Sequence, residues 1–168
     1  KKAIKNTTGK ILTWKNKPIN TVYHATNGGV MASLDEAWST NSVPYLQTRL
    51  DGPKTWSREV DLPLSNEKHL QSFLFSKSEA FGSNHHLFRW NRTLEASQIL
   101  KQLNKSQKVS SSFYPKKIKI LTRGSSGRVT SLIIEGNTGS EILLQLDDIR
   151  RVLRQLPSTL FVVKEIKE

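Results

Sequence analysis

The sequence predicts an α+β fold with a mainly antiparallel sheet and short helices interspersed singly. Two observations indicate this fold class. Several stretches rich in β-branched residues are joined by short segments with Gly, Asn or Pro, which is typical of antiparallel strands. Single segments between them carry apolar residues at helical spacing. A chain of 168 residues can bury a core without disulfides. We expect one domain over 1–168, with two lobes sharing a core as the alternative.

The first half of the chain alternates predicted strands and helices. Strands are expected over 10–15 and 19–25, on either side of Asn16-Lys17-Pro18, because their residues are largely β-branched or aromatic. A short helix is expected after Ser33, whose hydroxyl can cap it. Residues 41–61 are expected to be irregular, and 62–88 resemble an insert. Within that stretch we expect a helix capped by Ser65, with Leu70, Phe73 and Leu74 on one face. A strand is expected over 87–91.

The second half has the clearest helical pattern. Thr93 is predicted to cap a helix whose apolar residues recur at i, i+3, i+4 and i+7; they are Ala96, Ile99, Leu100 and Leu103. A serine-rich loop follows. Further strands are expected over 116–122, 128–135, 140–146 and 159–166, with a short helix capped by Asp147 before the last of them.

The charge is strongly and unevenly positive. Lys and Arg number 26 against 14 acidic residues, a formal net charge of +12. No acid precedes Asp35, and none lies between Ala96 and Ile134. This balance favours a polyanionic partner: nucleic acid, an anionic membrane or an acidic cell-wall polymer. A basic domain with solvated faces is the alternative. Nucleic acid is disfavoured because the two clearest helices are amphipathic rather than basic.

Several classes of site are excluded or disfavoured. The absence of cysteine excludes disulfides, iron–sulfur clusters and cysteine zinc sites. No apolar run approaches 18 residues, so no helix is expected to span a bilayer. His85 and His86 are adjacent, and on an extended segment they would point to opposite sides, so they are not expected to share a metal ion. With no cysteine and with His69 on a separate helix, no zinc site is expected, and no other cofactor is expected either. The chain has no initiator Met and no signal peptide, and we expect it to be a fragment or a processed form.

Two loops carry groups that can hold a ligand. The first runs from Tyr23 to Gly29, where His24 can bind a hydroxyl or move a proton beside a Gly-Gly turn. The second is Arg123-Gly124-Ser125-Ser126-Gly127-Arg128, whose backbone N–H groups, hydroxyls and guanidiniums are suited to an anion. It lacks the Gly-Lys-Ser/Thr ending of a P-loop, which disfavours a nucleotide. The alternative for each loop is an ordinary hairpin turn.

Taken in order, these pieces resemble the stage II sporulation protein D/amidase-enhancer (LytB-type, SpoIID) domain family. The resemblance covers nearly the whole chain. In the first half it is carried by Ala3, Thr7, Gly9, Trp14, Pro18-Ile19, Tyr23-His24, Gly28-Gly29, Glu36, Trp38 and Pro44-Tyr45-Leu46. In the second half it is carried by Arg123-Gly124, Ser126-Gly127-Arg128, Gly136, Ile149-Arg150, Leu153, Leu156, Ser158-Thr159 and Phe161.

The resemblance implies action on peptidoglycan in the cell envelope. It implies lytic transglycosylase-type cleavage of glycan strands by the intact protein, with a catalytic glutamate on a helix upstream of Lys1 that this sequence lacks. A non-catalytic module that binds peptidoglycan, or that activates an amidase partner, is the alternative. The substrate-binding residues implied are His24, Asn27, Gly28, Gly29, Tyr45, Arg123, Ser126, Arg128 and Arg150.

The charge agrees with such a substrate. Glycan stripped of its stem peptides carries a lactyl carboxylate on every muramic acid, and arginine can grip a carboxylate through two parallel hydrogen bonds. We therefore expect the His24–Gly29 turn and the Arg123–Arg128 loop to face one cleft, the first holding the sugar and the second its carboxylate.

Overall fold

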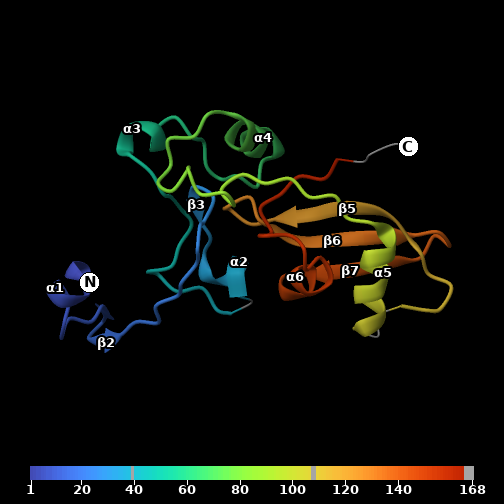
Figure 1. Ribbon diagram of the computed structural model, residues 1–168, viewed down its shortest axis with the longest axis horizontal. Helices are drawn as coiled ribbons and strands as arrows, with labels where there is room; N and C mark the ends of the chain where they lie inside the picture. Colours follow the sequence, from blue (N-terminus) through green and yellow to red (C-terminus); the bar gives the residue numbers. More distant parts are fainter. Residues whose placement is uncertain (39, 107–108, 165–168) are drawn as a thin grey trace.

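The computed structural model describes residues 1–38, 40–106 and 109–164, and its α+β architecture confirms the predicted fold class (Figure 1). The helices are α1 (Lys2–Asn6), α2 (Leu34–Trp38), α3 (Lys54–Ser57), α4 (Glu67–Phe75), α5 (Ala96–Lys105) and α6 (Asp147–Val152). The strands are β1 (Thr13–Trp14), β2 (Lys17–Pro18), β3 (Val30–Met31), β4 (Arg49–Leu50), β5 (Pro115–Arg123), β6 (Val129–Gly136) and β7 (Glu141–Gln145). They form two two-stranded sheets and one three-stranded sheet, all antiparallel.

The three-stranded sheet is a meander in the order β5-β6-β7. Its strands lie within one residue or so of the predicted ranges, because hairpin neighbours pair locally and their turns are marked by glycine. Gly127 and Gly139 both have positive φ, at +79° and +73°, at the two turns. β6 is the central strand: Ile134 faces Ile118 of β5 on one side and Ile142 of β7 on the other.

One hydrophobic cluster lies between this sheet and two helices. α5 and α6 pack on the sheet, as Figure 1 shows. The helical face predicted from the i, i+3, i+4, i+7 spacing is the buried one, since Ile99 and Leu103 are both in the core. The other members of this cluster are Phe113, Val129, Leu132, Ile134, Leu144, Ile149, Val152, Leu153 and Phe161.

A second cluster lies around α3 and α4. Its members are Val30, Trp56, Leu64, Leu70, Phe73, Ala80, Phe88 and Leu160. Five of these eight come from the stretch 62–88, so that segment is integral to this core. Leu160 belongs to the second cluster and its neighbour Phe161 to the first, so the C-terminal segment connects the two. The backbone N–H of Val129 also donates to the carbonyl of Thr159 at 2.9 Å.

The predicted strand over 19–25 is wrong, and the first hairpin is shorter than expected. β1 and β2 have two residues each, and the turn between them is Lys15-Asn16, both with positive φ. Positive φ at both central residues suits the twist of a two-residue hairpin. Residues 19–25 find no partner strand among the described residues, and β-branched sequence cannot hold an unpaired strand in water.

The strands predicted over 87–91 and 159–166 are also wrong where they can be tested. Residues 87–91 follow a series of turns in which Phe88 N–H donates to the His85 carbonyl at 2.8 Å. Residues 159–164 are not a strand, while 165–166 lie outside the described residues. Phe88 of the first segment and Leu160 of the second are buried in the second cluster, and Phe161 is buried in the first. Burial of these side chains, and not a ladder of strand hydrogen bonds, holds the two segments in place.

The four expected helices exist as α2, α4, α5 and α6, whereas α1 and α3 were not predicted, α3 lying in the segment 41–61 that was expected to be irregular. Three predicted caps are wrong. α4 is capped by Asn66 instead of Ser65, with the Asn66 Oδ1 accepting from Lys68 N–H at 3.0 Å. α5 is capped by Glu95 instead of Thr93, in a capping box with Gln98. α6 begins at Asp147, so Asp147 is its first residue and not its cap. Several neighbouring residues can cap a helix, and the entry path of the chain selects among them.

Candidate ligand-binding cleft

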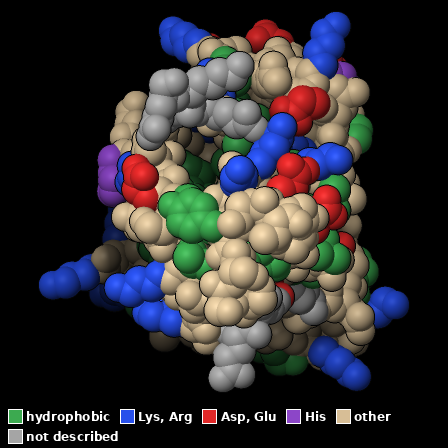
Figure 2. Space-filling model, turned by 90° about the vertical axis from the view of Figure 1, so that its right-hand side faces the viewer, with side chains coloured by type: hydrophobic (Ala, Val, Ile, Leu, Met, Phe, Trp, Pro, Cys, Tyr) green, Lys and Arg blue, Asp and Glu red, His purple; other side chains and the backbone are tan. Residues whose placement is uncertain are grey.

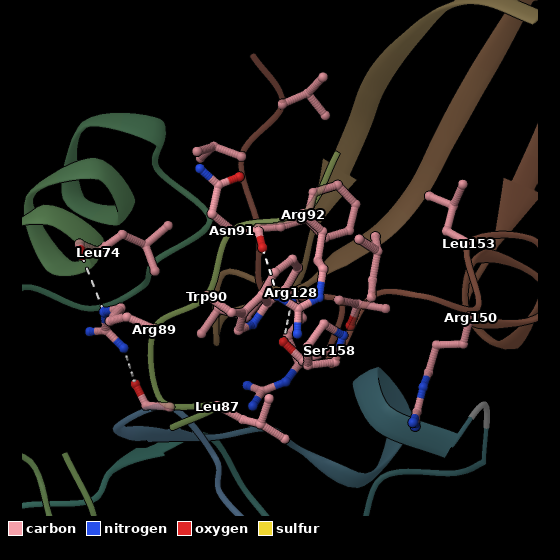
Figure 3. Close-up of a pocket in the computed structure, with 18 of the residues that line it drawn as sticks. Leu74, Leu87, Arg89, Trp90, Asn91, Arg92, Arg128, Arg150, Leu153 and Ser158 are labelled. Carbon is pink, nitrogen blue, oxygen red and sulfur yellow. Dashed lines mark hydrogen bonds between the residues drawn. The ribbon is translucent and has the colours of Figure 1, made fainter. Parts of the chain in front are cut away.

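A cavity of about 1090 Å³ lies between the two hydrophobic clusters, and Figure 3 shows part of its lining. Phe88 and Leu160 reach it from the second cluster, and Ile99 and Phe161 from the first. Five of the nine predicted ligand residues line it: His24, Asn27, Gly28, Arg128 and Arg150. The His24–Gly29 turn and the end of the Arg123–Arg128 loop therefore do meet at one cleft.

The lining is mostly apolar but its charge is strongly positive. Leu74 contributes apolar surface from α4, and Leu87 and Trp90 contribute it from the segment between α4 and α5. Among the described lining residues, one is acidic, Glu95, and seven are basic: Arg89, Arg92, Lys116, Lys117, Arg128, Arg150 and Lys164. An apolar cleft with few acids and many cations attracts an anion that also has apolar surface.

Arg128 is part of the cleft wall and holds the backbone of the Gly-Gly turn. Its guanidinium donates to the carbonyls of Val30 at 3.2 Å and Asn27 at 3.0 Å. Burial lowers the pKa of Arg128 to about 10, and the charge of Glu36 partly opposes that shift. The group is therefore protonated at neutral pH, and its principal partners are backbone carbonyls.

The predicted anion-binding loop is occupied by a carboxylate of the same chain. Glu36 of α2 reaches the loop, where its Oε2 accepts from the Ser126 N–H at 3.2 Å and from the Ser126 hydroxyl. Its Oε1 accepts from Thr48 at 3.4 Å. A Cβ at Gly124 would collide with the Glu36 side chain. The loop does hold an anion through a backbone N–H and a hydroxyl, but that anion is the Glu36 carboxylate of the same chain, and Ser126 is buried.

The other predicted ligand residues lie away from the cleft. Arg123 binds Glu67 at 3.2 Å and donates to the carbonyls of Phe161 and Gly127, at 2.8 and 3.0 Å. It borders a separate cavity of about 550 Å³ instead. Tyr45 packs against Trp14 with ring centroids 6.3 Å apart. Gly29 is buried in the second cluster's packing, where a Cβ would lie 2.9 Å from the Ala80 Cβ.

Two cleft residues with free surface were missed by sequence reasoning. Trp90 follows Arg89 directly and Arg92 comes two residues later, and both lie near the centre of the view in Figure 3. Arg92 is exposed, and the contact of its Nη1 is with the carbonyl of its neighbour Asn91 at 2.8 Å. A tryptophan between two arginines was a signal for this site.

The two adjacent histidines differ from expectation. Their rings stack with centroids 4.5 Å apart instead of pointing to opposite sides. The reason is that the segment turns: His85 N–H donates to the Gly82 carbonyl at 2.9 Å, and Leu87 N–H to His85 Nδ1 at 3.1 Å. Across the ranges that the structure describes, no group of three or more His, Asp or Glu side chains is placed to hold a metal ion.

Arg89 anchors the cleft floor to α4. Its guanidinium donates to the carbonyls of Phe73, Leu74 and Gly28 at 2.8–3.1 Å and lies 4.3 Å from the ring centre of Phe88. Burial lowers its pKa to about 10. We expect Arg89→Met to lower the free energy of unfolding by about 3 kcal/mol, because the buried carbonyls lose charged donors. Urea denaturation checks this.

Arg92, an exposed arginine three positions further along the chain, is the matched control for Arg89. Arg92→Met removes the same charge and length of side chain but no donor to a buried carbonyl, so its unfolding free energy should change by less than about 0.5 kcal/mol. Equal losses in the two variants would show that Arg89 does not anchor the floor.

The structure thus defines an α+β domain with a basic, partly aromatic cleft between two hydrophobic clusters. Residues 32–168 match a family described as a domain of unknown function (DUF8618), and the chain belongs to that family. Neither the curated proteins nor the solved structures that were searched gave a match. None of the helices that the structure describes has both the length and the apolar character to cross a bilayer.

The resemblance to the stage II sporulation protein D/amidase-enhancer family is therefore wrong as an assignment. The family that matches is a different one, and no match to the sporulation family is found. Several of the motifs that carried the resemblance contain glycine. Gly127 shows the role that such a residue has here, since its φ is +79° at a turn and a Cβ would lie 2.8 Å from Leu70.

Proposed function

We propose that this domain binds an anionic glycan strand in the cleft. The observation that carries the proposal is the composition of the lining as far as the structure describes it: seven basic residues, one acid and an apolar floor with Trp90. A pyranose ring has an apolar face of C–H groups that packs on an indole, while its substituents take hydrogen bonds. A carboxylated sugar therefore matches both parts of the lining.

The basic side chains able to contact such a ligand are those that do not donate their hydrogen bonds to buried backbone carbonyls. Arg89 and Arg128 bind backbone carbonyls, whereas Arg92 and Arg150 are exposed at the cleft. Figure 3 shows Arg150 extending from α6 and Arg92 from the segment before α5. Arginine offers two parallel donors to a carboxylate, which gives orientation as well as attraction.

Peptidoglycan glycan stripped of stem peptides is the substrate that we propose. Its carboxylate recurs on every second sugar, so a strand presents charge and apolar sugar faces in alternation. The basic and apolar lining of the cleft is what supports this substrate. Binding at the cell envelope is the function proposed; cleavage by an intact protein, and activation of an amidase, stay predictions without further support from the structure.

Within the described part of the lining, no acid is placed in a manner that supports cleavage. Glu95, the acidic residue among the described lining residues, accepts from the backbone in the capping box of α5. Glu36 is engaged by Ser126 in the other loop. General acid catalysis needs a carboxyl group within reach of the glycosidic oxygen, and neither residue has that freedom here. We therefore propose a binding function for these residues.

Binding is tested with purified stripped glycan strands by isothermal titration calorimetry. The double variant Arg92→Gln/Arg150→Gln should weaken binding by about tenfold or more, since each charge-assisted hydrogen bond contributes about 1.5–3 kcal/mol before solvent screening. Raising the salt should weaken wild-type binding as well, because exposed charges are screened.

Two controls separate this proposal from general charge attraction. Arg58→Gln/Arg154→Gln removes two exposed arginines outside the cleft, and its affinity should stay within about twofold of wild type. A chitin oligosaccharide, which lacks the carboxylate, should bind more weakly than the stripped glycan. Equal weakening in the two double variants, or tighter binding of duplex DNA than of glycan, would overturn the proposal.

A further inference from the structure

The first 18 residues form an arm that is exposed throughout. It comprises α1, β1 and β2, and every residue of 1–18 is exposed to solvent. Figure 1 shows it in blue at the edge of the molecule, apart from the three-stranded sheet. The ring contact of Trp14 with Tyr45 joins it to the body. The matched family begins at residue 32, so the arm lies outside the family region.

Large apolar side chains project from this arm into solvent. Ile4 is 75% exposed, Ile11 71%, Leu12 67% and Trp14 44%. Together with Val22 and Tyr23, which follow the arm closely, they account for six of the 14 large hydrophobic residues that are exposed in the described structure. Such side chains are costly in water unless something covers them.

The charge of the arm has a single sign. Lysines occupy positions 1, 2, 5, 10, 15 and 17, and no acid occurs in the arm. The body differs: on the face shown in Figure 2, Asp and Glu side chains lie among the Lys and Arg side chains. The arm therefore combines an uncompensated positive charge with exposed aliphatic and indole groups.

We propose that the arm binds the surface of an anionic lipid bilayer. Lysines close to an anionic leaflet each contribute about fivefold to the partition coefficient. Ile4, Ile11 and Leu12 can enter the boundary between headgroups and acyl chains, and an indole such as Trp14 is stable at that depth. The lysine stems let the ammonium groups stay among the headgroups.

Two other partners fit the arm less well. Nucleic acid would use the lysines and Trp14, but it offers no apolar phase for three exposed aliphatic side chains. A second copy of the chain would bring the same arm face to face with itself in a two-fold dimer, which would place six lysines against six with no acid between them. An anionic bilayer satisfies the charge and the apolar groups together.

The test is co-sedimentation of the whole chain with vesicles made of equal parts of phosphatidylcholine and phosphatidylglycerol. The variant Lys10→Gln/Lys15→Gln/Lys17→Gln should lower the partition coefficient by at least about tenfold. The matched control is Lys101→Gln/Lys105→Gln/Lys119→Gln, which removes the same charge from exposed positions on α5 and β5. It should keep most of the wild-type binding.

A charge-neutral variant separates apolar insertion from attraction. Ile11→Ser/Leu12→Ser should also lower the partition coefficient, although the net charge is unchanged, and the Trp emission of wild type should shift to the blue on binding. The substituted residues are exposed, so thermal unfolding should be unchanged in all variants.

The proposal is overturned if the arm and body lysine variants lose equal affinity, if Ile11→Ser/Leu12→Ser binds like wild type, or if wild type does not bind the vesicles. Binding of duplex DNA that depends on the arm, without vesicle binding, would overturn it in favour of nucleic acid. Arg92→Gln/Arg150→Gln should leave vesicle binding unchanged, so this outcome is independent of the cleft.

Discussion

Replacing Glu36 by alanine is expected to lower the free energy of unfolding by about 3 kcal/mol. The Glu36 carboxylate accepts from the Ser126 N–H and hydroxyl, and Ser126 is completely buried. Without the carboxylate these donors lose their partner. The buried guanidinium of Arg128 also loses the charge that opposes its desolvation. Urea denaturation monitored by Trp fluorescence measures the loss.

The neighbouring acid on the same helix is the matched control. Asp35 is exposed in the first turn of α2, so Asp35→Ala should cost less than about 0.5 kcal/mol beyond its helix-dipole contribution. Glu36→Gln keeps the shape and one acceptor oxygen, and should fall between Glu36→Ala and wild type. If Glu36→Ala unfolds at the same urea concentration as Asp35→Ala, the carboxylate does not hold the loop.

Substituting Gly29 by alanine is the second change with a large expected effect, again about 3 kcal/mol. Gly29 has φ of +93°, where an L side chain is strained. Its Cβ would also lie 2.9 Å from the Cβ of Ala80 and 3.2 Å from the ring of Phe88. Both neighbours are buried, so the core must shift to accept one methyl group. Thermal and chemical unfolding measure this.

Gly139 provides the comparison that isolates packing from backbone strain. Its φ is +73°, but an added Cβ would meet nothing within 4 Å. Gly139→Ala should therefore cost about 1–2 kcal/mol, the strain alone. The difference between the two variants measures the close approach at Gly29. Equal costs would mean that the second cluster tolerates the methyl group, and that Gly29 is present for its φ alone.

Two of the residues predicted to bind ligand have a structural role instead. Gly29 and Arg128 were predicted to touch ligand, whereas their contacts build the wall against which a ligand would lie. Arg92 and Trp90 present the available surface. A variant of Arg128 would consequently disturb folding and binding together, and Arg92 and Arg150 are the residues that test binding alone.

The sequence by itself determined the elements whose signals are local. The strands β5, β6 and β7 follow from β-branched runs separated by glycine turns, and the buried face of α5 follows from helical spacing. Hairpin pairing and helix amphipathicity depend on residues a few positions apart, so they can be predicted without the rest of the fold. The charge pattern predicted a polyanionic partner, and that stays a prediction.

Only the tertiary structure decided the partners that lie far apart along the chain. Glu36 occupies the loop at Ser126, 90 positions away, and Arg128 binds the carbonyl of Asn27, 101 positions away. The residues of 19–25 and 87–91 have strand-like composition, yet neither becomes a strand. A strand needs a partner and a guanidinium takes whatever acceptor is buried beside it, so both depend on packing that composition and spacing do not contain.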